Sequence, residues 1–173
     1  MALRPVRLLG DEVLRKKAKK VDRVNDFIRT LLDDMADTMY KNDGVGLAGN
    51  QIGVLKRVIV VDDGDGLMQL VNPVIVERDG VQRNEEGCLS LPETYGTVER
   101  AEKVIVNALD RKGVRLRIEA EGFLARILQH EIDHLDGKLF IDTADGIHKA
   151  GENPDGSPKE SVDAPAEKEE AKV

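Results

Sequence analysis

Apolar residues near the start of the chain recur at steps of three and four positions. The stripe is formed by Val24, Phe27, Ile28, Leu31, Leu32, Met35 and Met39. This spacing predicts an amphipathic helix, because residues three and four apart share one helix face. Asp22 is the expected N-cap, and Asn42-Asp43-Gly44 is the expected end.

Several shorter stretches with apolar and β-branched residues follow, separated by turn-forming residues. They are Arg57–Val61, Met68–Glu77, Lys103–Ala108 and Val114–Ala120. Their composition and length predict β-strands. The Asp110–Gly113 stretch between the last two is typical of a hairpin turn, which would pair those strands antiparallel.

A second helix is predicted from Glu121 to Leu135, ended by Asp136-Gly137. It carries apolar residues on two sides. The core side would hold Leu124, Leu128, Ile132 and Leu135, and the other side Phe123 and Ile127. The second group would make an apolar pocket wall, although ordinary core packing explains it too.

Together these elements predict one α+β domain: mainly antiparallel strands around a central helix, with an N-terminal amphipathic helix. The length of 173 residues fits a single domain. We expect this domain to occupy residues 1–145. Residues 146–173 are expected to form an acidic tail that is disordered in isolation, because Gly151–Val173 offers almost nothing to bury.

Charge and hydropathy exclude several classes of function. The formal net charge of −7 argues against broad nucleic-acid binding and against a basic membrane-surface protein. No apolar run approaches the 18 residues of a membrane span, and Met1–Arg7 lacks the apolar region of a secretory signal. A cytoplasmic location without a membrane partner is therefore expected.

The strongest chemical signal lies on the second predicted helix, where the sequence reads His130-Glu131-Ile132-Asp133-His134. Residues four apart differ by about 40° around a helix axis, so both imidazoles can reach one metal ion. Glu131 projects from a neighbouring direction, where it can contact a water at the metal. Two exposed histidines beside a salt-bridging glutamate are the weaker interpretation.

The two histidines need a third partner, because a catalytic tetrahedral ion usually takes three protein ligands and one water. The obvious donor is Cys88, the only cysteine of the chain, within Glu85–Ser90. A metal would hold its sulfur as a soft thiolate ligand. Two alternatives rank lower: a cysteine nucleophile with a histidine partner, and a buried inert thiol.

A third candidate for a functional segment is the glycine-rich stretch Gly44–Gln51. It contains the spacing G-x-G-x-x-G, but a helix precedes it and a strand follows, so a dinucleotide site is disfavoured. Glycines let a backbone approach a ligand closely, and the Gln51 amide could donate to a developing oxyanion. The alternative is a flexible turn with a surface glutamine.

Three stretches together resemble the signature motifs of the peptide deformylase family, in the same order and at similar spacing. They are Gly44–Gln51, Glu86–Ser90 and Gln129–His134, within a region of resemblance from roughly Arg4 to Ile141. The second and third match closely. The first departs from the family, which usually has Ala-Pro or a similar pair where this chain has Gly49-Asn50.

The resemblance implies removal of the N-formyl group from the initiator methionine of nascent bacterial proteins, with release of formate. Cys88, His130 and His134 would bind one divalent ion, often Fe(II) in this family, with zinc, nickel or cobalt as alternatives. Glu131 would take a proton from the attacking water and pass one to the departing amine.

The same resemblance implies further site residues. The Gln51 amide and the Leu89 backbone N–H would stabilise the oxyanion together with the metal. The positions of four further residues, apart from the resemblance, give hypotheses for substrate contacts: Val45, Gly46, Phe123 and Ile127. The first two would pair with the peptide backbone by β-addition, and the last two would form the methionine pocket. The formyl-Met nascent peptide and a transient ribosome contact are the expected partners, without specific nucleic-acid binding.

Other functions are kept open. A general metallopeptidase with the same helix motif more often draws its third ligand from a downstream residue, and only His148 follows. A non-enzymatic, metal-stabilised binding protein would want a fourth protein ligand, and the chain has no second cysteine. A family member that has lost activity is motivated only by Gly49-Asn50.

Overall fold

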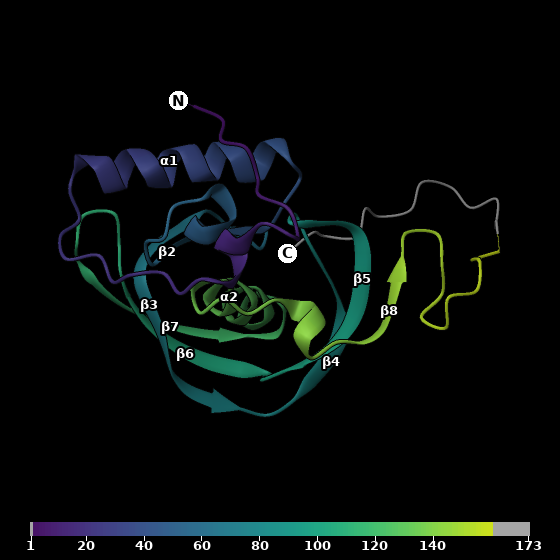
Figure 1. Ribbon diagram of the computed structural model, residues 1–173. Coiled ribbons are helices and arrows are strands. Elements are labelled where there is room, and N and C mark those ends of the chain that lie inside the picture. Colours follow the sequence, from purple (N-terminus) through teal and green to yellow (C-terminus); the bar gives the residue numbers. More distant parts are fainter. Residues whose placement is uncertain (1, 161–173) are drawn as a thin grey trace.

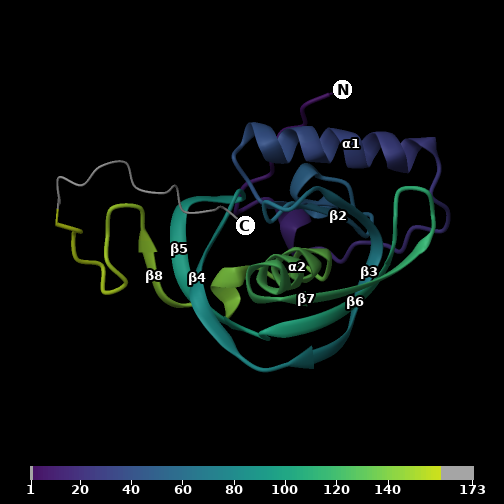
Figure 2. The same cartoon turned by 180° about the vertical axis from the view of Figure 1, so that it is seen from behind.

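The structure is a computed structural model and describes residues 2–160. Strongly curved strands wrap around one helix, α2 (Gly122–Leu135), and a second helix, α1 (Asp26–Lys41), lies across the outside (Figures 1 and 2). Every pair of neighbouring strands in the two sheets is antiparallel. The predicted α+β class and its mainly antiparallel pairing are therefore confirmed.

The larger sheet has five strands in the order β1-β2-β3-β6-β7. Their bounds are β1 Gly46–Ala48, β2 Val58–Val61, β3 Met68–Asp79, β6 Lys103–Leu109 and β7 Arg115–Glu121. All four predicted strands belong to this sheet, with ends shifted by one or two residues. The turn at Asp110–Gly113 is present: the Asp110 carboxylate accepts hydrogen bonds from the N–H groups of Lys112 and Val114.

The smaller sheet has the order β4-β5-β8, with bounds β4 Gln82–Cys88, β5 Leu91–Arg100 and β8 Asp145–Lys149. The hydrophobic pattern does not predict these strands, because β4 reads Gln-Arg-Asn-Glu-Glu-Gly-Cys and buries only its last three residues. Backbone pairing with β5 holds it instead.

Strand β8 falls at the start of the range expected as a tail. Residues 146–149 belong to this strand, and the His148 side chain is buried. The described part of the same range also contains a bridge between Glu152 and Pro158. Residues 161–173 of the expected tail lie outside the described residues.

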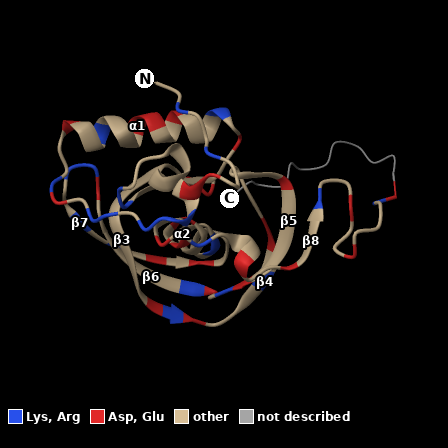
Figure 3. Cartoon of the chain, viewed as in Figure 1, with Lys and Arg blue, Asp and Glu red and all other residues tan. Residues whose placement is uncertain are grey.

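Helix α1 begins later than its apolar stripe suggested. The predicted N-cap at Asp22 is wrong: Asn25 is the cap, and its side-chain oxygen accepts a hydrogen bond from the Ile28 N–H at 3.1 Å. The helix ends at Lys41, before Asn42. Its buried face packs on β1 and β2, whereas acidic and basic residues are interspersed along it (Figure 3).

Helix α2 is buried along most of its length, because it lies in the concave side of the sheets. It begins at Gly122, one residue later than predicted, and Gly137 follows its end with a φ of 74°. A Cβ at Gly137 would lie 2.7 Å from the Arg15 carbonyl carbon, so a glycine is needed there. Within residues 2–160 neither helix is long and apolar enough to cross a bilayer.

Candidate metal centre and active site

Three metal-ligating side chains converge between the end of β4 and the second half of α2. Cys88 is the last residue of β4, and His130 and His134 lie one turn apart on α2. Their ligand atoms all lie within 4.8 Å of one another, and all three residues are buried. Cys88 Sγ lies 3.4 Å from His134 Nε2, which lies 3.2 Å from His130 Nε2.

The two imidazoles present their Nε2 atoms to one point. His130 Nδ1 lies 2.7 Å from Glu86 Oε1, and donation to this carboxylate leaves the His130 Nε2 lone pair free. Burial, together with neighbouring His130, holds the pKa of His134 well below its usual range, which favours a neutral His134 ring. Two ring nitrogens and one sulfur therefore face the same point.

Glu131 places a carboxylate in the same buried region. The residue is fully buried, and neither of its carboxyl oxygens has a hydrogen-bond partner within residues 2–160. Burial raises the pKa of the Glu131 carboxyl well above its usual range, and the Glu86 carboxylate raises it further. An unpartnered buried carboxyl is costly, which is typical of a group kept for chemistry.

Glycine at position 46 makes room for this carboxylate. A Cβ built on Gly46 would overlap Glu131 Oε1 and would lie 2.8 Å from Glu131 Cδ. Strand β1 therefore passes directly against the face of α2 that carries Glu131. This contact brings the glycine-rich stretch next to the histidine motif.

Glu86 is the hub of a buried ion network behind the histidines. It accepts hydrogen bonds from Arg100 Nε and Nη2, each at 2.9 Å, and also pairs with Arg126. Burial alone would raise the pKa of Glu86, but hydrogen bonds from Arg100 and His130 hold this pKa well below its usual range. A permanently charged Glu86 fixes the orientation of the His130 ring.

Gln51 reaches the site from the single-turn helix η2 (Gly49–Ile52). Its Nε2 donates to Ser90 Oγ at 3.1 Å and to Cys88 Sγ at 3.4 Å, while its Oε1 accepts from the Ala48 N–H at 2.9 Å. The amide nitrogen is thereby aimed at the sulfur and its surroundings. The alternative of a surface glutamine is wrong, since Gln51 is fully buried.

The other predicted residues lie in different settings. Leu89 follows Cys88 in the turn between β4 and β5, and Val45 immediately precedes β1. Phe123 is 41% exposed, at the start of α2. Ile127 has no exposed surface and belongs to an apolar core cluster with Leu128 and strand residues, so ordinary core packing explains its position.

Sequence reasoning missed the network formed by Glu86, Arg100 and Arg126. One signal was available: Arg126 interrupts the apolar run of the second helix. A buried guanidinium needs an acidic partner, because an unpaired buried charge is strongly destabilising. No sequence spacing pointed to Arg100, which pairs with both Glu86 and Asp133 from the end of β5.

The geometry weighs against Cys88 as a nucleophile. Burial and the Glu131 carboxylate raise the pKa of the Cys88 thiol to about 12, whereas a nucleophilic cysteine needs a lowered pKa. Outside this centre, the described part of the chain holds no other group of three His, Cys, Asp or Glu ligands that could bind a metal. His148, the alternative third ligand, contacts Glu85 and the Gly146 carbonyl instead.

Comparisons with known proteins find one family. Residues 3–150 match the polypeptide deformylase family. A peptide deformylase of Thermoanaerobacter pseudethanolicus is 60% identical over 144 residues, which cover 83% of this chain and 91% of that protein. The crystal structure of a peptide deformylase from Legionella pneumophila is 52% identical, with a TM-score of 0.79 over 82% of this chain and 86% of that one. The Thermotoga maritima enzyme is 41% identical, with a TM-score of 0.82 over 83% and 99%.

Proposed function

The chain belongs to the polypeptide deformylase family of metal-dependent hydrolases, and we propose that Cys88, His130, His134 and Glu131 carry its reaction. The reaction removes the formyl group from formyl-Met peptides. One observation carries the assignment of residues: a thiol and two imidazoles from β4 and α2 meet beside a buried carboxyl that has no partner of its own within residues 2–160.

The donor set fits one divalent ion. Two neutral imidazoles and a thiolate are suitable ligands for iron, zinc, nickel or cobalt. Three protein donors leave a position open, as catalytic centres require. When bound, the ion supplies Lewis acidity, which lowers the pKa of a water and polarises the formyl carbonyl. We propose Fe(II) as the native ion, and oxygen-sensitive activity with stoichiometric iron would support it.

Glu131 is the group that moves protons. Its raised pKa makes it a stronger base than an exposed carboxylate, which suits a residue that accepts a proton and later releases it. Glu131 takes a proton from the water that attacks the formyl carbon. It then passes a proton to the amine nitrogen as the C–N bond breaks, which releases formate and a free N-terminal methionine.

Gln51 and the Leu89 backbone N–H stabilise the oxyanion that forms on the formyl oxygen. The Gln51 Nε2 position, 3.4 Å from Cys88 Sγ, supports this role because it places a donor next to the reacting centre. A formyl group carries only hydrogen on its far side, so a tight site can admit it and reject an acetyl group or a peptide chain.

Strand β1 offers an edge for the substrate backbone. It is an edge strand of its sheet, and within residues 2–160 it pairs with β2 alone. The Asp62 N–H donates to the Val45 carbonyl at 2.9 Å, so the alternation of an antiparallel ladder turns the N–H and C=O of Gly46 away from β2. We propose that the peptide adds to this edge, with Phe123 and Ile127 on the methionine side.

The activity is tested by measuring formate release from a formyl-Met peptide. We expect Glu131→Ala to reduce kcat by more than about a hundredfold, since both proton transfers depend on this residue. The exposed Glu119→Ala serves as the matched control and should stay within about twofold of the unchanged protein. A chelator should abolish the activity of the unchanged protein.

The same assay separates the rival functions. Cleavage of unformylated peptides would favour a general metallopeptidase. Bound metal without release of formate would favour a binding protein or an inactive family member. We also propose a cytoplasmic, bacterial setting with transient ribosome contact, because the substrate is a nascent chain; cosedimentation of the protein with translating ribosomes tests it.

A further inference from the structure

The departure at Gly49-Asn50 lies directly before the oxyanion glutamine, inside η2. Asn50 has no exposed surface. Its Nδ2 donates to the Lys16 carbonyl at 2.7 Å, while its Oδ1 has no partner within residues 2–160. A buried acceptor without a partner is destabilising, and an apolar side chain of similar size would avoid it. The Nδ2 hydrogen bond is therefore what this position gains from asparagine.

The preceding residue fits the same arrangement. A Cβ built on Gly49 would lie 2.7 Å from the Lys56 carbonyl oxygen and 2.8 Å from the Val54 carbonyl oxygen. The turn thus packs directly against the backbone of residues 54–56, closer than an alanine at this position would permit. Gly49 allows η2 to lie close to the backbone of residues 54–56, and Asn50 bonds η2 to the Lys16 carbonyl.

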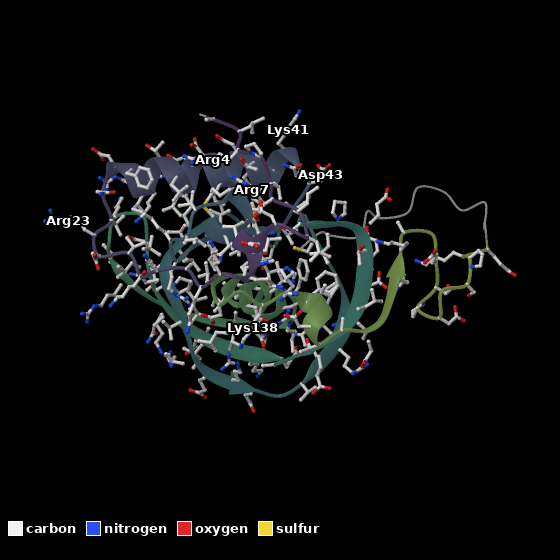
Figure 4. The ribbon with its side chains drawn as sticks, viewed as in Figure 1. Arg4, Arg7, Arg23, Lys41, Asp43 and Lys138 are labelled. Atoms are coloured by element: carbon white, nitrogen blue, oxygen red, sulfur yellow. The ribbon has the colours of Figure 1, made fainter. Side chains whose placement is uncertain are left out.

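The N-terminal segment holds this turn at two points. The Arg7 N–H donates to the Gln51 carbonyl at 2.6 Å, and the Lys16 carbonyl receives the Asn50 amide. Figure 4 labels Arg7 on this segment, below α1. Because Asn50 and Gln51 are adjacent in one helical turn, a shift of Asn50 moves the Gln51 backbone. The contacts of the Gln51 side chain with Cys88 and Ser90 depend on that backbone.

We propose that Asn50 is a positioning residue for Gln51: its amide ties η2 to the Lys16 carbonyl and so holds the Gln51 Nε2 at the oxyanion position. The inference rests on the proposed role of Gln51. It assigns the Gly49-Asn50 pair a function in this chain, since proline at position 50 could not donate the hydrogen bond.

The test uses Asn50→Leu, which keeps the size of the side chain and removes the donor. We expect kcat to fall about tenfold while KM stays within about twofold. A misplaced donor reduces the stabilisation of the transition state more than it reduces the affinity for the substrate. Asn50→Ala is the second variant and covers the case in which leucine cannot pack. The midpoint of thermal unfolding and the metal content are measured on each protein.

Asn72→Gly provides a matched control. Asn72 ties the same N-terminal segment to the fold, because its side chain bonds to the Val21 N–H and carbonyl at 2.8 Å each and not to η2. Glycine tolerates the positive φ of 52° at this position. This variant should lower the thermal midpoint while kcat stays within about twofold. An equal fall of kcat in Asn72→Gly would overturn the proposal, since the effect would then be general loosening.

A double-mutant cycle decides whether Asn50 acts through Gln51. We expect Gln51→Ala alone to reduce kcat about a hundredfold, and the Asn50→Leu/Gln51→Ala protein to be no slower. Independent, multiplying effects would contradict a positioning role, and so would an unchanged kcat in Asn50→Leu when Gln51→Ala is slow. Full activity of Gln51→Ala would instead refute the oxyanion role of Gln51.

Discussion

At the residue scale, the site separates two buried carboxyl groups into different tasks. Glu86 receives hydrogen bonds from Arg100 and His130, which keep its pKa low and its charge fixed. Glu131 is buried, its carboxyl oxygens have no hydrogen-bond partner within residues 2–160, and its pKa is raised. Where the pKa values of two carboxyl groups in one site are shifted in opposite directions, the group with the lowered pKa stays charged and the group with the raised pKa can exchange protons. In the proposed mechanism Glu86 orients His130, and Glu131 moves the proton.

The contact between Gly46 and Glu131 gives a residue-scale prediction. Gly46→Ala should reduce kcat at least about tenfold, because the new methyl group must displace the Glu131 carboxylate or strand β1. Formate release at saturating peptide measures this effect. Metal content should stay at one ion per chain, since no ligand is touched. Unchanged kcat with normal metal content would show that Glu131 tolerates the displacement.

At the element scale, the N-terminal segment is an outer support for both α1 and the site. Asp34 on α1 accepts hydrogen bonds from the Ala2 N–H at 3.0 Å and from Arg4 Nε and Nη2 at 3.0 and 2.9 Å. Burial tends to raise the pKa of Asp34, but these donors outweigh it and the pKa is lowered. The same segment then continues to Arg7 and Lys16, which hold η2.

Asp34→Asn tests this support through pH. A carboxyl whose pKa is lower in the folded state than in the unfolded state stabilises the folded protein. This contribution is complete at pH values above the unfolded pKa, about 3.9, and is lost as the pH falls through the folded-state pKa. We expect the variant to be about 1–3 kcal/mol less stable at pH 7. The difference should shrink below about pH 4, because protonated Asp34 resembles asparagine.

Urea unfolding of both proteins at a series of pH values measures this difference. A gap that stays constant down to the acid end would contradict the contribution of the Asp34 charge. Asp26→Asn is a suitable control, because that carboxylate is almost fully exposed, at 98%, in its pair with Arg29.

At the scale of the whole molecule, the metal centre joins the two sheets through α2. Cys88 lies in the three-stranded sheet, whereas the histidine helix packs against β1, β2 and β7 of the five-stranded sheet. A bound ion would therefore cross-link parts of the fold that are otherwise held by packing and by the Glu86 network. Ligands that bind only the folded state stabilise it.

Metal removal should lower the thermal midpoint by about 10 °C. An ion present at about a thousand times its Kd contributes about 4 kcal/mol, and each kcal/mol corresponds to about 2–4 °C in a chain of this size. Calorimetric scans with and without a chelator measure the shift. Cys88→Ala should melt at the same temperature in both scans, and a chelator effect that persists in this variant would place the stabilising ion elsewhere.

The sequence by itself determined the elements whose side chains carry periodic patterns. The α1 stripe, the strands of the larger sheet and the α2 helix all follow from spacing, because one face of each is buried. It also predicted a candidate ligand set, Cys88, His130 and His134, and the fold brings these three side chains within 4.8 Å of one another. The pattern did not predict strands β4, β5 and β8. Strand β4 buries only its last three residues, and backbone pairing with β5 secures it.

Only the tertiary structure decided which residues support the ligands. Glu86, Arg100 and Arg126 come from β4, β5 and α2, and Gly46 meets Glu131 across two elements. Such contacts depend on how strands curve around a helix, and the local sequence does not predict that curvature. Local periodicity reports which face is buried; the folded chain alone determines which residues meet there.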